Sequence, residues 1–451
     1  MAQGTGIPRR MLDDMNQFFL EALDMREHPM KKAKLKTQTE YITALTYIIE
    51  RTISEANCYQ TDVEKYITER LHMYQNRLFA NISSNINREL GMSCLCAFEK
   101  SWQSKYRFML VCDAALILLD ETLVLRAAEI IKERLSAKWQ ADIDQVSSLL
   151  QNRQRIRKKY LPASSLLRQY RANKIFFSKK ERRIIVTANM SAGKSTLINA
   201  LVGKPIARTS QEVCTGNICY LFSKAYEDGN IHLSTPELNL SATADDLRGY
   251  DWNEPIAIAS YFAGIIPDIP RLCIIDTPGV DAALYKEHSE LAHDALLNEN
   301  YDTILYVVSP TRLGTDAEKR HLQWAAQNLQ KEKMIFVLNK LDNYHAFSDS
   351  IEESVENFKE DLQKIGFENP VVCPISAYFS YLLKLQMTGR ALSEDEADEY
   401  ALYAKKFKKS SYDLSHYYEG VECLPTDSKE IALSKRAGLY GLEKIIYGGI
   451  L

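Results

Sequence analysis

Long apolar runs are scarce in this chain of 451 residues. The longest, residues 108–119, is interrupted by Asp113 and is too short to cross a bilayer, so the sequence predicts a buried helix there. The first fourteen residues, MAQGTGIPRRMLDD, contain no apolar core of the kind that an export signal needs. We therefore expect a cytoplasmic protein, and any contact with the inner face of a membrane to be peripheral.

Paired cysteines are missing as well. Nine cysteines are spread along the chain without a CxxC pair, and Cys94 and Cys96 are the closest two. This spacing favours reduced, buried thiols over a disulfide framework or a zinc site. The content of 46% hydrophobic and 25% charged residues is that of an ordinary globular protein, and the length allows two to three domains.

Charge is unevenly distributed, although the formal net charge is only −3. Residues 1–180 carry 29 Lys and Arg against 20 Asp and Glu, and the remainder carries 27 against 39. Residues 153–183 hold twelve basic side chains and one acid, Glu181. Such a run binds an anionic membrane surface or RNA phosphates, or it packs as a solvated face against the acidic part of the chain. Nucleic acid is the less favoured partner, because the run lacks the interleaved aromatic and glycine residues of single-strand binders.

Residues 184–203, IIVTANMSAGKSTLINALVG, read as a strand, a loop of small residues and a helix. This is the context of a phosphate-binding P-loop, in which backbone N–H groups surround the phosphates. Lys194 would place its charge between two phosphates, and the Ser195 hydroxyl would bind Mg²⁺. Ala188 stands where the pattern has glycine, and it fits if its φ stays negative. The predicted phosphate-binding residues are Asn189, Met190, Ser191, Ala192, Gly193, Lys194, Ser195 and Thr196.

Three later segments follow buried-strand runs and complete a guanine-nucleotide pattern. Residues 276–279, DTPG, offer Asp276 for Mg²⁺ and the Gly279 amide for the γ-phosphate. Residues 339–342, NKLD, offer Asn339, the Lys340 stem and the Asp342 carboxylate, which would accept the N1–H and N2–H₂ of guanine. Ser376 and Ala377 follow a fourth strand and would place a backbone N–H near guanine O6. The Mg²⁺ ligands that these motifs predict are Ser195 and Asp276.

The predicted organisation is an all-α helical bundle followed by an α/β P-loop GTPase domain with a mostly parallel, doubly wound sheet. We expect a helical, neck-like domain at 1–172, a basic linker at 173–183 and the GTPase domain at 184–451. One long helix is predicted from Trp102 to about Leu135, and a short one ends near Ala172. Residues 228–230, Asp-Gly-Asn, predict a hairpin turn, and the tyrosine- and acid-rich residues 392–418 predict a solvated helical face.

The stretch between Ser195 and Asp276 spans 81 residues, about twice the spacing in small signalling GTPases and Era-type GTPases. With that length, the sequence resembles the dynamin superfamily, particularly bacterial dynamin-like proteins, over about residues 181–447. The resemblance rests on NMSAGKSTLINALVG, EVCTGNICYLF, IIDTPGVDAALYKEHSEL, YDTILYVVSPTRLGTDAEKRHL, FVLNKLDN and the closing AGLYGLEKII.

The resemblance implies roles for several residues. Thr215 resembles the switch threonine that binds Mg²⁺ and orients the attacking water. Ser191 matches a position that helps to bind a monovalent cation, and with Lys194 and Thr215 it forms the predicted catalytic set. Met190 stands where relatives often carry a polar residue that reaches the water. Val280 stands where Ras-like enzymes carry a glutamine, so no such glutamine serves in cis.

The favoured function is that of a dynamin-like GTPase which hydrolyses GTP to GDP and phosphate with Mg²⁺. The resemblance implies activation through a homodimer of GTPase domains and coupling to an anionic membrane or to a partner dynamin-like subunit. Two alternatives stay open. One is a translation- or ribosome-associated, Era-like GTPase, and the other is a nucleotide-dependent scaffold with little turnover.

Overall fold

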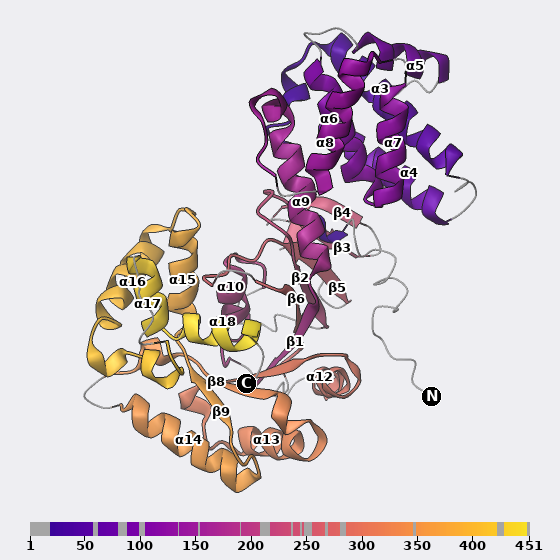
Figure 1. Ribbon diagram of the computed structural model, residues 1–451. Helices are drawn as coiled ribbons and strands as arrows, with labels where there is room; N and C mark the ends of the chain where they lie inside the picture. The colour runs from indigo at the N-terminus through magenta and orange to yellow at the C-terminus, as the bar shows by residue number, and fades with distance from the viewer. Residues whose placement is uncertain are drawn as a thin grey trace, which may run out of the picture. The chain divides into compact units, whose positions relative to one another are not determined.

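The chain forms two compact units in the computed structural model: residues Glu21–Ser178, and the described residues from Lys179 onward together with Phe19 and Leu20 (Figure 1). The first is all helical and the second is built on a sheet, as the sequence predicts. No helix among the described residues is long and apolar enough to cross a bilayer. The structure describes residues 19–56, 62–79, 88–98, 104–133, 135–151, 154–189, 191–207, 217–235, 238–243, 246–247, 255–266, 269–279, 286–345, 349–421 and 428–448.

The helical unit packs amphipathic helices around α6, whose residues from Phe108 to Leu118 are all buried. Its described elements are η1 (Pro29–Lys32), α3 (Leu35–Glu55), α4 (Asp62–Leu78), α5 (Arg88–Ala97), α6 (Ser104–Leu118), α7 (Glu121–Lys132), α8 (Ala137–Gln151), η3 (Lys158–Ala163) and α9 (Ser164–Ser178). The α7 helix, for example, buries one stripe of aliphatic residues and leaves its charged residues in solvent.

Asp113 is a buried acid in α6, and its carboxylate is satisfied by three side chains. The hydroxyls of Tyr41 and Tyr74 donate to it over 2.5 and 2.8 Å, and His28 Nε2 lies 3.2 Å away. A buried carboxylate is tolerated only when it is hydrogen-bonded in this way. Burial and the negative charge of Asp113 together raise the pKa of both tyrosines.

Two expectations about this unit are wrong in detail. The predicted helix 102–135 is divided between α6 and α7, because Leu119 has a positive φ of 58° and the Asp120 carboxylate caps α7 by accepting from the Leu123 amide over 3.0 Å. The last helix does not stop near Ala172 but continues to Ser178, and β1 begins at Glu181. Most of the segment 173–183 is therefore helix and strand.

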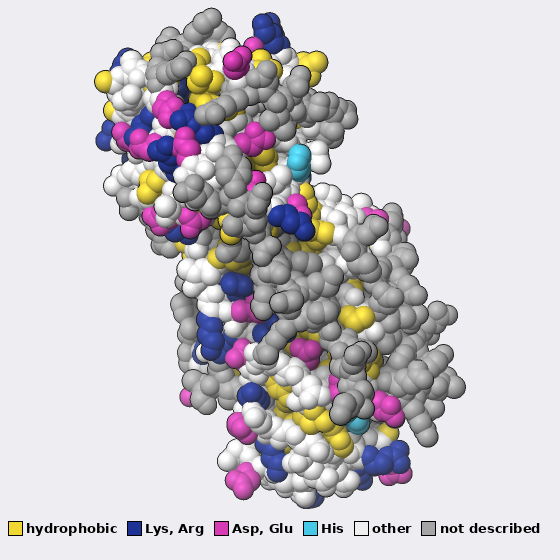
Figure 2. Space-filling model, turned by 90° about the vertical axis from the view of Figure 1, so that its right-hand side faces the viewer, with side chains coloured by type: hydrophobic (Ala, Val, Ile, Leu, Met, Phe, Trp, Pro, Cys, Tyr) yellow, Lys and Arg dark blue, Asp and Glu magenta, His cyan; other side chains and the backbone are white. Residues whose placement is uncertain are grey.

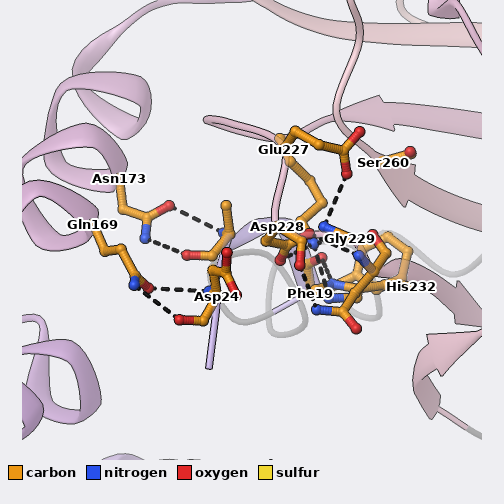
Figure 3. Close-up of polar contacts among 12 residues, drawn as sticks. Phe19, Asp24, Gln169, Asn173, Glu227, Asp228, Gly229, His232 and Ser260 are labelled. Atoms are coloured by element: carbon orange, nitrogen blue, oxygen red, sulfur yellow. Dashed lines mark hydrogen bonds and ion pairs between the residues drawn. The ribbon is translucent and has the colours of Figure 1, made fainter. Parts of the chain in front are cut away.

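The α9 helix also holds the start of the helical unit. Asn173 exchanges two hydrogen bonds with the backbone of Ala22, at 2.8 and 3.1 Å. Gln169 does the same with Asp24, at 2.9 and 3.0 Å (Figure 3). These four bonds satisfy backbone groups that precede the first described helix of the unit.

The second unit is a doubly wound α/β layer structure. Its sheet has nine described strands in the order β4-β3-β5-β2-β6-β1-β7-β8-β9. Five neighbouring pairs are parallel, and β2–β6, β3–β4 and β3–β5 are antiparallel. The strands are β1 (Glu181–Ala188), β2 (Cys219–Ser223), β3 (Ile231–Ser234), β4 (Leu238–Ala242), β5 (Ile256–Ser260), β6 (Arg271–Asp276), β7 (Thr303–Val308), β8 (Met334–Leu338) and β9 (Val371–Pro374).

Helices cover both faces of this sheet, which explains why its central strands are buried apolar runs. One face packs against α10, α15 and α18 in a core that includes Val186, Leu197 and Leu442 (Figure 1). On the other face, Phe336 of β8 contacts Phe358 of α14, and Tyr306 of β7 stacks on His321 of α13. The helices are α10 (Lys194–Val202), α12 (Lys286–Asn298), α13 (Asp316–Asn328), α14 (Ile351–Ile365), α15 (Ala377–Met387), α16 (Glu394–Lys406), α17 (Lys429–Arg436) and α18 (Leu439–Gly448).

The predicted hairpin at 228–230 is not present, because β5 lies between β2 and β3 in the sheet. The turn instead forms a polar cluster in which Lys224 Nζ lies 2.6 Å from Asp228 and 3.0 Å from His232 Nε2. Lysine only donates, so Nε2 of His232 accepts and its Nδ1–H donates to the Phe19 carbonyl over 2.6 Å (Figure 3). This cluster binds Phe19 to the sheet unit.

Candidate functional site

The predicted nucleotide-binding segments meet at one edge of the sheet. Strands β6, β1, β7, β8 and β9 are mutually parallel neighbours, so their carboxyl ends share that edge. Hydrogen bonds and an ion pair then join the loops that follow β1, β6, β8 and β9. This is the edge at which open α/β sheets bind ligands.

The loop after β1 has the backbone conformation of a phosphate cradle. Ser191 and Gly193 have positive φ angles of 62° and 91°, and α10 starts directly afterwards at Lys194. A Cβ atom on Gly193 would lie 2.3 Å from Asn339 Nδ2, so only glycine fits there. Ala188 remains in β1, paired with Val307, and has no positive φ; the missing glycine is therefore tolerated. Ser195 and Thr196 occupy the half-buried first turn of α10.

Lys194 and Asp276 form an ion pair between the first turn of α10 and the end of β6. Both side chains are largely buried, and Asp276 is only 1% exposed. Burial raises the pKa of the Asp276 carboxyl, while the neighbouring Lys194 ammonium acts in the opposite direction. The next residue, Thr277, donates its hydroxyl to the Val186 carbonyl over 3.0 Å, which fixes the start of the DTPG loop that leads to half-buried Gly279.

Asn189 is held from the opposite side by α13. Its Nδ2 donates to Glu318 Oε2 over 2.7 Å, and both side chains are buried. Glu318 stands in the first turn of α13, which Thr315 caps through the Glu318 amide. The T-x-x-E spacing signals a helix start in the sequence, but it does not say that the carboxylate reaches the P-loop. Sequence reasoning therefore missed this contact.

Asn339 connects the loops of three strands. Its Nδ2 donates to the Ala192 carbonyl at 3.0 Å and lies 3.5 Å from the Gly193 carbonyl, and its Oδ1 accepts from the Ala377 amide over 2.9 Å. A single buried side chain thereby fixes the P-loop relative to the loops after β8 and β9.

The residues predicted to bind the guanine base lie in the loops after β8 and β9, which contact each other. Ser376 Oγ donates to Asp342 Oδ1 over 2.6 Å, and both residues are buried. Lys340 has a positive φ of 65°, a left-handed conformation that lets the chain turn between Asn339 and Asp342. The acceptor and the amide that the sequence predicts for one end of a guanine base thus lie in adjoining loops.

The glycine-rich close of the chain packs against the loop after β9. Ser376 donates its amide to the Ala437 carbonyl over 3.1 Å. A Cβ on Gly438 would lie 2.3 Å from the Pro374 carbonyl, and one on Gly441 would lie 2.1 Å from the Tyr418 ring. Gly438 is required by the close approach of the loop after β9, and Gly441 by the close approach of the Tyr418 ring.

Three predicted residues lie outside the described residues: Met190, Thr215 and Val280. Among the described residues, no group of three or more His, Cys, Asp or Glu side chains could hold a metal ion. The oxygen donors of Ser195 and Asp276 nevertheless suit Mg²⁺, which is usually bound by one or two carboxylates and otherwise by water and phosphate.

The bridging role of Asn339 gives a first prediction. Asn339→Ala should lower the free energy of unfolding by about 1–3 kcal/mol, because a buried amide and a buried carbonyl lose their partner. Hydrogen exchange at the Ala377 amide should accelerate in step. Asn343→Ala, an exposed position four residues on, is the matched control. Unchanged protection of Ala377 in the Asn339 variant would contradict the bridge.

Comparison with known proteins agrees with this geometry. The model of the dynamin family matches residues 184–341. The chain is 28% identical over 220 residues to a probable transmembrane GTPase, FZO-like and chloroplastic, from Arabidopsis thaliana. That match covers 48% of this chain and 21% of the relative, so the chain spans about one fifth of the relative's length.

Several solved structures are similar in part. An oligomerised bacterial dynamin pair aligns with 92% of this chain and 63% of its own, at a TM-score of 0.35 and 15% identity. Toc33 from Arabidopsis thaliana aligns with 57% of this chain and 84% of its own, at a TM-score of 0.31 and 16% identity. Era from Aquifex aeolicus, bound to GDP and AlF4⁻, aligns with 48% of this chain and 58% of its own, at a TM-score of 0.28 and 19% identity. The segment 184–341, which holds the P-loop, the start of the DTPG loop and Asn339, is therefore similar to the dynamin family.

Proposed function

We propose that this chain binds GTP and hydrolyses it to GDP and phosphate, as a dynamin-like enzyme. The observation that carries the proposal is the Asn339 amide, which joins the P-loop carbonyls to the Ala377 amide. A phosphate cradle and a base-reading loop held at a fixed separation suit one nucleotide that spans both.

The phosphate half of the site consists of backbone amides of residues 189–196 and the Lys194 ammonium. The start of α10 adds the positive end of a helix dipole. Ser195 and Asp276 would hold Mg²⁺, with Thr215 as the third ligand that the family resemblance implies. When bound, the metal neutralises charge on the phosphate oxygens. A monovalent cation near Ser191 is part of the same proposal.

The base half of the site consists of Asp342, Lys340 and Ala377. An aspartate accepts from N1–H and N2–H₂ of guanine, groups that adenine does not offer, and the Ala377 amide would donate to O6. Ser376 donates to Asp342 Oδ1 and so orients the carboxylate. A base with the wrong donors would leave a buried charge without partners, which is the physical origin of selectivity.

Base selectivity gives the second prediction. Asp342→Asn should lose its preference for guanine nucleotides and gain affinity for xanthine nucleotides, because the donor–acceptor pattern is reversed at one edge. Lys194→Ala should lose affinity for guanine and xanthine nucleotides alike, because it removes charge from the phosphate half. Titrations with GTP, XTP and ATP test this, with the exposed Asp361→Asn as control. Wild-type protein that binds ATP as tightly as GTP would refute the base assignment.

Catalysis is proposed to require a second copy of the chain. Val280 stands where a water-orienting glutamine is found in Ras-like enzymes, and an isopropyl group cannot hydrogen-bond. Phosphoryl transfer depends on positioning and electrostatics, so an incomplete site is slow. In the dynamin superfamily two GTPase domains meet across the nucleotide, and here Ser191, Thr215 and the segment after Gly279 would lie near that contact.

The third prediction follows from the two-fold contact. GTP turnover per molecule should rise with protein concentration, because an isologous dimer forms in a second-order step. A transition-state mimic with Mg²⁺ should shift the protein from monomer to dimer in sedimentation experiments. Turnover that stays flat over a hundredfold dilution, with a persistent monomer in the mimic-bound state, would exclude activation by dimerisation.

Membrane association is proposed from the family and from the basic segment 153–183. Two of its basic side chains are engaged within the helical unit: Arg171 donates to the Leu149 carbonyl, and Lys159 pairs with Asp142. Arg155 and Lys158 are exposed, beside the exposed apolar Leu161. Figure 2 shows basic and acidic side chains interspersed on the described part of the face it draws. Peripheral binding at the cytoplasmic face of an anionic membrane would therefore be weak and salt-dependent.

The fourth prediction compares polyanions. Cosedimentation with anionic liposomes should fall as salt is raised and should weaken further in the Arg155→Ala/Lys158→Ala variant. Liposomes of neutral lipid are the control for the surface charge. Tighter binding to purified ribosomal RNA than to anionic liposomes would favour the ribosome-associated alternative, and binding to neither would leave the basic segment with only its intramolecular contacts.

A further inference from the structure

The tyrosine- and acid-rich residues 392–418, expected as a solvated helical face, are solvated only in part. The acidic first turn of α16 is exposed and closed by a capping box between Ser393 and Glu396. The end of the helix is different, since Ala404 and Phe407 are buried. The segment therefore packs through its carboxyl end, and that end lies against the loop that carries Asp342.

Lys406, the last residue of α16, makes the central contact. Its Nζ donates to the backbone carbonyls of Asp342 and Tyr344, at 2.6 Å each. The Tyr412 hydroxyl donates to the same Tyr344 carbonyl over 3.1 Å, and the Tyr412 ring lies 4.7 Å from the Lys406 ammonium. Two carbonyls that lie on either side of Asn343 are thus held by one cation.

Lys406 is itself fixed by its neighbours. The ring of Phe407 stacks on Phe379, with centroids 5.2 Å apart and planes inclined by 14°. Phe379 belongs to α15, the helix that begins directly after Ser376. Arg436 donates to the Lys408 carbonyl over 2.7 Å and pairs with Asp413 at 3.2 Å. The end of α16 is therefore attached to both loops of the base half.

We propose that Lys406 is a positioning residue for guanine recognition. It holds the backbone on both sides of Asn343 and so keeps the Asp342 carboxylate in the orientation that N1–H and N2–H₂ require. This inference rests on the proposed function and adds a specificity determinant 64 residues beyond Asp342 in the chain. Charge-assisted hydrogen bonds to backbone carbonyls are strong enough for this role.

The test compares nucleotides that differ only where Asp342 reads them. IDP lacks the N2 amino group of GDP, so the ratio of the two affinities reports how well the carboxylate is placed. Lys406→Met keeps the length of the side chain and removes its donors. We expect this variant to bind GDP about tenfold more weakly and to lose less affinity for IDP. The ratio of GDP affinity to IDP affinity should therefore fall. Lys405→Met, an exposed lysine of the same helix, is the matched control.

The outcomes separate this inference from the function on which it rests. A general folding defect would weaken GDP and IDP equally, and an unchanged ratio in Lys406→Met would overturn the positioning role. If the wild-type protein prefers GDP over ADP, and Lys406→Met keeps the wild-type ratio of GDP to IDP affinity, only the positioning role of Lys406 is refuted. Wild-type protein without any preference for GDP over ADP would refute the proposed function and the role of Lys406 together.

Discussion

The side-chain amide of Asn339 is the constraint on which the geometry of the site depends. It uses its donor for the P-loop carbonyls and its acceptor for the Ala377 amide. The same nitrogen leaves no space for a Cβ at residue 193, so the glycine and the asparagine require each other. Parallel strands bring the loops to one edge, but this buried amide decides how far apart the phosphate and base halves are.

Much of this arrangement could be predicted from the sequence. The strands at 184–188, 272–275 and 334–338 are continuous apolar runs, and each ends in residues whose chemistry suits a nucleotide. Local patterns could not supply side-chain pairings over long distances. The contact between Asn189 and Glu318 spans 129 residues, and no spacing rule encodes it. The turn at 228–230 was misread because it marks a local bend and not which strands pair.

Two buried lysines lie at the far end of the P-loop helix α10. Lys384 of α15 donates to the Leu201 carbonyl at the end of α10 over 2.7 Å and pairs with buried Glu443 of α18 at 2.5 Å. Lys204, just after α10, pairs with Glu227 at 2.5 Å and bonds to Ser260 over 3.0 Å. Breaking the buried pair between Lys384 and Glu443 is costly, so α10 is anchored at its far end.

If the chain binds a nucleotide as proposed, the ion pair between Lys194 and Asp276 is the contact that would change most directly. In the proposed function, phosphate oxygens attract the Lys194 ammonium, and the Asp276 carboxylate serves Mg²⁺. A bound nucleotide would thus replace a direct ion pair by contacts of each partner with ligand groups of opposite charge. Asp276 begins the DTPG loop, whereas Asn339 and Lys406 hold the base half through backbone groups that carry no net charge. If the chain binds a nucleotide as proposed, the phosphate half would therefore be the part whose charged contacts change, whereas the contacts that hold the base half would stay as they are.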